Sequence, residues 1–254
     1  MWRAAYPSAY VFKTIFTTIP KIVEDLVFEI TREGVVIRRM EEKRVVFIRI
    51  SIPSGVFRVW HYERDYEIGV SAALLARVFK NAKKYEKVEF LVEDDEFKII
   101  LYDPEHPVDA KTFVIKQLSL EEPFTLPKDL KNDVYVEFLP EFYVEIIKGA
   151  TSIKGENLKI TTHTQSRTVK FSTETELGER YEYVLDLEKS KYVTQYEIRN
   201  DAESEYSLHY LSKIVNIAKI ADIAKIEYST KLPLMIHFLI SQIHFQYVQA
   251  PRVL

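Results

Sequence analysis

The chain has 254 residues, of which 47% are hydrophobic and 29% are charged, and its formal net charge is −3, so it can bury one large or two ordinary cores. Cysteine is absent, which excludes disulfides, thiolate catalysis and thiolate metal sites. No apolar run reaches the roughly 20 residues that cross a bilayer, and the N-terminus lacks a signal-peptide layout, so we expect no membrane partner.

The first half of the chain predicts two helices and a pair of strands. The first helix is indicated by apolar residues at helical spacing, namely Phe12, Ile15, Phe16 and Ile19. Residues 70–100 then predict a helix, a strand, a short acidic turn and a second strand. The turn contains Asp94 and Asp95, which favour turn geometry and solvation.

The second half repeats this plan. Its first helix is predicted by another set of apolar residues at helical spacing, namely Phe142, Ile146, Ala150 and Ile153. Residues 208–238 match the order of residues 70–100, with a helix, a strand, a turn and a closing strand. Two similar units of roughly 120 residues therefore stand in tandem, which indicates duplication of a domain.

A search for catalytic motifs finds none. The six histidines are scattered, with no pair at metal-ligand spacing, and His237 in an apolar strand favours a structural role. No Gly-rich phosphate loop and no GxSxG elbow occur in the sequence. We therefore expect no catalytic residue, no metal and no cofactor. An enzyme with an unrecognised α+β active site remains an alternative.

Basic residues gather on the predicted helices. They are Lys13, Lys21, Arg77, Lys80, Lys83, Lys84, Lys148, Lys213 and Lys219. A solvated helix face would explain any one helix. However, no acid lies between Ser71 and Tyr85, or from Tyr206 until Asp222. A positive face on a slightly acidic chain favours weak, sequence-independent contact with DNA, with retention supplied by geometry.

Four segments carry a resemblance to a known family. They are RRMEEKRVVFIRISIP at 38–53, VSAALLARVFKNAKK at 70–84, SEYSLHYLSKIV at 204–215, and the tail PLMIHF with QYVQAPRV at 233–253. With the duplication, they resemble the sliding clamps of the proliferating cell nuclear antigen (PCNA) family, and the archaeal members in particular.

This resemblance implies an α+β DNA-clamp fold, with helices packed on antiparallel sheet in each of two similar domains. The implied boundaries are 1–118 for the N-terminal domain, 119–130 for the interdomain connecting loop and 131–254 for the C-terminal domain. Three subunits would close into a pseudo-sixfold ring, with the basic residues facing duplex DNA in its hole. The third helix departs from the family pattern, because Glu141 and Glu145 accompany Lys148.

The resemblance also implies a subunit interface. Family members join head to tail through edge strands, for which the candidates here are Lys111 to Leu118 and Glu179 to Leu187. Both segments alternate in part, as edge strands do. The expected interface residues are Phe113, Ile115, Tyr181, Tyr183 and Leu185.

The segment between the halves predicts an exposed apolar cluster, because Pro123 and Pro127 prevent regular pairing around Phe124 and Leu126. Such a cluster could pin the linker to the body. The resemblance implies instead a docking pocket for client proteins. The implied pocket residues are Met40, Val45, Phe124, Leu126, Pro127, Pro233, Leu234, Val248, Ala250 and Pro251. Val248 stands where many relatives carry Tyr.

The function implied by the resemblance is a DNA sliding clamp subunit without catalytic activity. It would act with a clamp loader and tether DNA polymerase, flap endonuclease and DNA ligase. The ring could be a homotrimer or a heterotrimer with paralogues, and a checkpoint-type clamp remains an alternative. We expect a cytoplasmic, nucleoid-associated protein if the source is archaeal and a nuclear one if it is eukaryotic.

Overall fold

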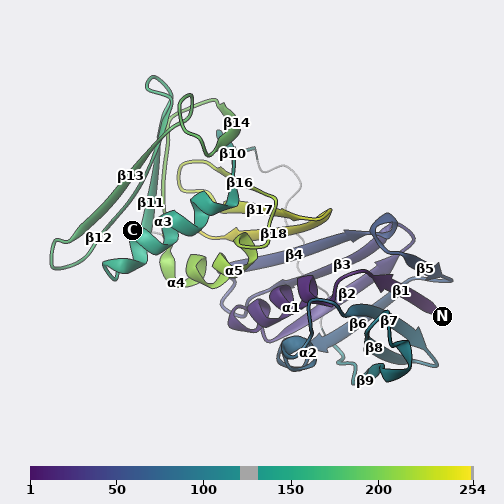
Figure 1. Ribbon diagram of the computed structural model, residues 1–254. Helices are drawn as coiled ribbons and strands as arrows, with labels where there is room; N and C mark the ends of the chain where they lie inside the picture. Colours follow the sequence, from purple (N-terminus) through teal and green to yellow (C-terminus); the bar gives the residue numbers. More distant parts are fainter. Residues whose placement is uncertain (121–130, 253–254) are drawn as a thin grey trace. The chain divides into compact units, whose positions relative to one another are not determined.

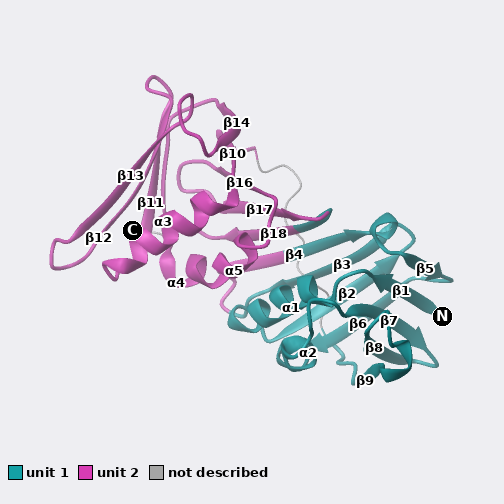
Figure 2. Ribbon diagram, viewed as in Figure 1, with its two compact units in different colours: residues 1–42, 49–124, 242–244 teal, residues 43–48, 125–241, 245–254 magenta. Residues whose placement is uncertain are grey.

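A computed structural model describes residues 1–120 and 131–252 (Figure 1). The chain divides into two compact units (Figure 2). Unit 1 comprises residues 1–42, 49–124 and 242–244, and unit 2 comprises residues 43–48, 125–241 and 245–254. The predicted pocket residues Phe124, Leu126 and Pro127 lie outside the described residues. Among the described helices, none is both long and apolar enough to cross a membrane.

The first half of the chain holds two α-helices, α1 (Ala9–Thr18) and α2 (Ala72–Lys80), and the 3₁₀ turns η1 (Ile19–Lys21), η2 (Ser54–Val56) and η3 (Pro107–Asp109). Its strands are β1 (Trp2–Tyr6), β2 (Asp25–Thr31), β3 (Gly34–Met40), β4 (Val46–Pro53), β5 (Val59–Tyr62), β6 (Tyr66–Ser71), β7 (Lys87–Glu93), β8 (Glu96–Tyr102) and β9 (Lys111–Ile115).

The second half holds α3 (Pro140–Ser152), α4 (Leu208–Leu211), the 3₁₀ turn η4 (Ser212–Ile214) and α5 (Val215–Ala218). Its strands are β10 (Val134–Phe138), β11 (Asn157–His163), β12 (Thr168–Glu174), β13 (Arg180–Asp186), β14 (Val193–Ile198), β15 (Ala202–Ser207), β16 (Ile223–Tyr228), β17 (Leu234–Ile240) and β18 (Ile243–Gln249).

The two halves repeat one topology. The strand order β5-β1-β7-β8-β9 recurs as β14-β10-β16-β17-β18, and β6-β2-β3-β4 recurs as β15-β11-β12-β13. Equivalent strands pair in the same antiparallel way, as in Phe28 opposite Ile37 and Ile160 opposite Phe171. The predicted duplication and the predicted α+β fold with antiparallel sheet are therefore confirmed.

Aromatic side chains attach the helices of each unit to its strands. In unit 1 the ring centroid of Phe12 lies 6.1 Å from that of Phe79 and 5.1 Å from that of Phe90. In unit 2 the ring of Phe142 lies 5.2 Å from Phe138 and 5.4 Å from Phe171. Burial of one such ring stabilises the fold by about 1.5–3 kcal/mol. These contacts fix which helix faces remain exposed.

The limits of helix α2 decide which basic residues lie on it. Helix α2 begins after Ser71, whose hydroxyl accepts the backbone N–H of Leu74 at 3.4 Å. It ends at Lys80, so Lys83 and Lys84 follow the helix instead of lying on it.

The helix expected from residue 208 onward was predicted as one continuous element, and this is wrong. The segment forms α4, η4 and α5 in succession. Ser212 donates its hydroxyl to the carbonyl of His209 at 3.1 Å, and such local bonds compete with regular helix bonding.

The acidic turn between β7 and β8 is confirmed. Asp94 and Asp95 have φ values of 49° and 61°, in the left-handed region. Asp tolerates this region better than most residues, because its short side chain bonds locally.

Candidate functional site

Two basic side chains of unit 1 meet over one aromatic ring. The Nζ atoms of Lys13 and Lys84 lie 5.8 Å and 5.5 Å from the ring centroid of Tyr10. Lys13 is half-buried and also donates to the carbonyl of Ala82 at 3.2 Å. The other expected DNA-facing residues here are exposed, namely Lys21, Arg77, Lys80, Lys83 and Lys84.

Two of the three expected basic side chains of unit 2 contact neighbouring side chains. The Nζ atom of Lys213 lies 4.6 Å from the ring centroid of Tyr210. The ammonium group of Lys219 donates to Oδ1 of Asn216 at 3.0 Å. Each ammonium group thus has a contact within its own helical segment, which limits its reach.

Helix α3 carries mixed charge on its exposed face. Lys148, Glu141 and Glu145 are all exposed. The hydroxyl of Tyr192 donates to Glu145 at 2.7 Å, and this bond to a carboxylate raises the pKa of Tyr192 to about 12. One of the two acids is therefore held by the loop before β14, while Lys148 remains the only basic residue on the helix.

Sequence reasoning missed the two tyrosines. Both precede their lysine by three residues, Tyr10 before Lys13 and Tyr210 before Lys213. Side chains three apart on a helix are neighbours, and a lysine near an aromatic face gains about 0.5–1 kcal/mol at exposed sites. The spacing was therefore a usable signal for preorganised lysines.

The two expected interface segments contain edge strands. Strand β9 is the last strand of the order β5-β1-β7-β8-β9, and β13 is the last of β15-β11-β12-β13. Val114 on β9 is 58% exposed and Val184 on β13 is 53% exposed. Both strands thus present apolar surface beside an open edge.

The expected interface residues themselves face inward to different degrees. Phe113, Tyr181 and Tyr183 are half-buried. Ile115 and Leu185 are buried in the core of their own units, so their side chains are not part of an exposed surface. Successive residues of a strand point to opposite faces, so the outward positions belong to Val114 and Val184, which sequence reasoning passed over.

Unit 2 contains a junction between the equivalents of these two strands. Strand β4 has the place of β13, and β18 has the place of β9. Inside unit 2, the backbone N–H of Ala250, just after β18, donates to the carbonyl of Val45, just before β4, at 2.8 Å. Strands β18 and β4 are therefore neighbours in a sheet, whereas their equivalents β9 and β13 are edge strands.

The described residues of the expected client pocket differ in exposure. Five are half-buried, namely Met40, Val45, Pro233, Ala250 and Pro251. Leu234 and Val248 are buried, so their side chains belong to the core and are not presented as surface.

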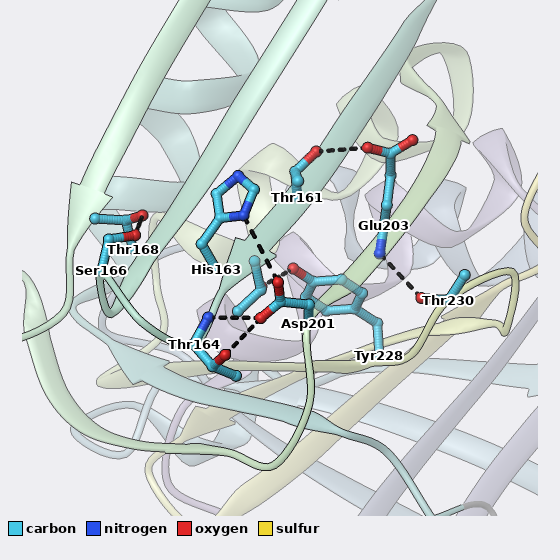
Figure 3. Close-up of polar contacts among 10 residues, drawn as sticks. Thr161, His163, Thr164, Ser166, Thr168, Asp201, Glu203, Tyr228 and Thr230 are labelled. Atoms are coloured by element: carbon cyan, nitrogen blue, oxygen red, sulfur yellow. Dashed lines mark hydrogen bonds and ion pairs between the residues drawn. The ribbon is translucent and has the colours of Figure 1, made fainter.

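The polar cluster drawn in Figure 3 ties loops of unit 2 together. Asp201 accepts the backbone N–H and the hydroxyl of Thr164 at 2.8 Å and 2.6 Å, which lowers its pKa. The backbone N–H of Glu203 donates to the hydroxyl of Thr230 at 3.1 Å. These hydroxyl and carboxylate groups are joined to one another across β-turns and strand ends, an arrangement typical of structural anchoring.

Comparison with known proteins identifies the family. The descriptions "Proliferating cell nuclear antigen, N-terminal domain" and "Proliferating cell nuclear antigen, C-terminal domain" match residues 1–122 and 129–253. The chain belongs to the proliferating cell nuclear antigen family. The resemblance inferred from the sequence segments is thereby confirmed.

Similar proteins occur in archaea. A "DNA polymerase sliding clamp" of Thermococcus gammatolerans is 26% identical over 253 residues, covering 99% of this chain and 98% of the relative. A protein of the same name from Nitrosopumilus maritimus is 26% identical over 244 residues, covering 95% and 94%. A crystal structure of a PCNA2–PCNA3 complex from Sulfolobus tokodaii matches the fold with a TM-score of 0.88 at 23% identity, covering 98% of this chain and 99% of that chain.

Proposed function

We propose that this family member is a DNA sliding clamp subunit that encircles duplex DNA with two further clamp subunits. The observation that carries the proposal is the pair of open edges β9 and β13 on a duplicated fold. Their equivalents β18 and β4 meet inside unit 2. Head-to-tail pairing of β9 with β13 of a neighbour would repeat that junction, and heterologous contacts of this kind close into a ring when the rotation between neighbours is a whole fraction of a turn.

The basic side chains of the α-helical segments fit the hole of such a ring. Exposed lysines and arginines attract phosphates without reading bases, which permits movement along any sequence. Unit 1 supplies most of this charge through Arg77, Lys80 and Lys84. The protein would act as a processivity factor without catalytic activity of its own, loaded onto DNA by a clamp loader.

The loop 119–130 and the half-buried residues Met40, Val45, Pro233, Ala250 and Pro251 would form the docking site for DNA polymerase, flap endonuclease and DNA ligase. We expect the Phe124→Ala, Leu126→Ala double variant to bind a peptide with an apolar residue and two aromatics at least roughly tenfold more weakly, or about 1.4 kcal/mol. Titration calorimetry measures the affinity. Equal affinity in both proteins would leave the loop as linker only.

Primer extension on a long single-primed template tests the function. A clamp loader and a replicative DNA polymerase should make longer products when the assembled protein is present, with no turnover by the protein alone. The advantage should disappear on a short linear template with free ends, because a ring slides off. Extension of unchanged length on the long template would refute the proposal.

A further inference from the structure

A tight turn after helix α2 carries an exposed tyrosine among lysines. The segment 80–87, called here the basic turn, contains four lysines and one acid, Glu86. The backbone N–H of Glu86 donates to the carbonyl of Lys83 at 3.2 Å, which closes a turn with Lys84 and Tyr85 at its tip. Both tip residues are exposed, and Tyr85 is 60% accessible to solvent.

The one acid of the basic turn is held inward. Glu86 is 5% exposed, and its carboxylate accepts the backbone N–H of Lys83 at 2.8 Å and the ammonium group of Lys111 at 2.5 Å. The carbonyl of Glu86 accepts the backbone N–H of Ala9, at the start of α1, at 2.9 Å. These bonds fix the turn to α1 and β9, so the exposed charges of the turn are all positive. A turn that is already fixed loses little entropy when it binds a ligand.

Two tyrosines at this place have different surroundings. The ring of Tyr10 is occupied, because the ammonium groups of Lys13 and Lys84 lie 5.8 Å and 5.5 Å from its centroid. The ring of Tyr85 has no ammonium or aromatic neighbour of this kind among the described residues. Tyr10 therefore positions ammonium groups, whereas the ring of Tyr85 is open to a ligand.

An open aromatic ring beside several ammonium groups indicates the class of ligand. In duplex DNA the bases are stacked on one another, so a protein reaches the phosphates but no free base face. An unpaired strand presents phosphates and base faces together, and sites that bind single strands without sequence preference combine basic and aromatic side chains. An acidic peptide would use the lysines but would offer Tyr85 no base to stack on.

We propose that the basic turn binds unpaired DNA, with one base stacked on Tyr85 and the flanking phosphates on Lys83 and Lys84. The inference rests on the proposed clamp function and adds a second DNA contact to it, with Lys84 shared between the two. A clamp on duplex DNA lies next to unpaired template while a primer is being extended. Contact with that strand favours the position of the clamp at the primer end.

Fluorescence anisotropy with two labelled ligands tests the proposal on the full chain. One ligand is oligo(dT) of about ten nucleotides, and the other is an abasic oligomer of the same length, which has the same phosphates without bases. The parent should bind oligo(dT) at least about fivefold more tightly, which corresponds to about 1 kcal/mol for one stacked base. Tyr85→Ala should remove this preference, whereas Lys83→Ala should weaken the binding of both ligands alike.

Two further substitutions at the same position are the matched controls. Tyr85→Leu keeps an apolar side chain without an aromatic face, so it should behave like Tyr85→Ala. Tyr85→Trp keeps an aromatic face and should retain the preference for oligo(dT). The emission of the introduced indole should fall when oligo(dT) binds and not when the abasic oligomer binds, with Tyr85→Ala giving the background from Trp2 and Trp60. Because Tyr85 is exposed, all these variants should fold.

The outcomes separate this inference from the proposed function. Equal affinity of the parent and Tyr85→Ala for oligo(dT), an equal loss of blunt duplex binding in Tyr85→Ala, or tighter binding of an acidic peptide than of oligo(dT) would overturn the proposal. Any of these results with long primer extension intact would leave the clamp function standing. Binding of oligo(dT) that depends on Tyr85, in a protein that gives no longer products, would retain the site and refute the clamp function.

Discussion

The two units share a topology but differ in how their helices carry charge. In unit 1, α2 is one continuous helix with Arg77 and Lys80 exposed in its last turn, where positive charge also favours the helix dipole. In unit 2, the equivalent segment is broken into α4, η4 and α5, and its lysines are tethered to Tyr210 and Asn216. The fold is repeated, whereas the surface is not.

The difference teaches that duplication preserves the core more strictly than the exposed faces. Phe12 and Phe142 lie in equivalent helices, and each packs edge to face on a ring of the preceding strand, Tyr6 at 5.1 Å and Phe138 at 5.2 Å. Around these anchors, α1 is followed by Lys21, while α3 carries Glu141 and Glu145. We therefore expect unit 1 to contribute more than unit 2 to DNA contact.

The largest expected effects come from the two anchor rings. Phe12→Ala and Phe142→Ala should each cost about 3–5 kcal/mol of unfolding free energy. Of the two, only Phe142 also contacts β13, one of the expected interface strands, with its ring 5.4 Å from that of Tyr183. Thermal unfolding and mass photometry, the latter in whatever subunit mixture forms the ring, should therefore show destabilisation in both variants but impaired association with neighbouring clamp subunits mainly in Phe142→Ala. Equal loss of assembly in both would contradict this division.

Removal of basic side chains should have the next largest effect and should distinguish the contributions of the two units to DNA contact. One variant replaces Arg77, Lys80 and Lys84 by Ala, and a matched variant replaces Lys148, Lys213 and Lys219. Exposed single charges rarely stabilise a core, so both should fold. Loader-dependent primer extension should fall further in the first variant. The slope of the logarithm of its DNA-binding constant against the logarithm of salt concentration should become shallower by up to about 2.7, at about 0.9 per lost phosphate contact. A larger loss in the second variant would reverse the assignment.

Acid should affect unit 2 through one glutamate. His237, whose Nε2 lies 3.4 Å from Oε1 of Glu227, and Lys225, whose Nζ lies 2.6 Å from the same oxygen, lower the pKa of Glu227 to about 2, against an ordinary value of 4.5. A lowered carboxyl pKa contributes stability above pH 4.5 that is lost as the pH falls toward 2. The ion pair between Lys225 and Glu227 is partly exposed. Glu227→Gln should therefore lower the free energy of unfolding by about 1 kcal/mol at pH 7 and by almost nothing near pH 2.

The equivalent position in unit 1 supplies the control. Leu91 pairs with Arg3 in β1 as Glu227 pairs with Tyr135 in β10, so unit 1 has no carboxyl there. Hydrogen exchange across the two units should show the acid-dependent change in unit 2 alone. A cost of Glu227→Gln that is constant from pH 7 to pH 2 would show that the carboxyl acts by packing and not by charge.

The spacing of residues along the sequence predicted those features of the fold that depend on residues close together in the chain. Apolar spacing located α1, α2 and α3, and the Asp94–Asp95 pair located a turn whose φ values require such residues. The bond between Tyr192 and Glu145 joins residues 47 apart, so no local pattern contains it. At the break after α4, the hydroxyl of Ser212 donates to the carbonyl of His209, and apolar spacing contains no sign of this bond. Val114 was overlooked because it lies between the inward residues Phe113 and Ile115, although alternation alone marks it as outward.

The smallest expected effect compares two serines at equivalent helix starts. Ser71 precedes α2 and accepts the N–H of Leu74, whereas Ser207 precedes α4 and makes no side-chain bond to its helix. A capping serine replaced by Ala costs about 0.5–2 kcal/mol, and the 3.4 Å length of this bond points to the lower end. Ser71→Ala should therefore lower stability by about 0.5–1 kcal/mol, and Ser207→Ala by less. Chemical denaturation of the two variants measures the difference, and an equal or larger cost for Ser207→Ala would mean that the broken helix is capped in solution as well as its continuous counterpart.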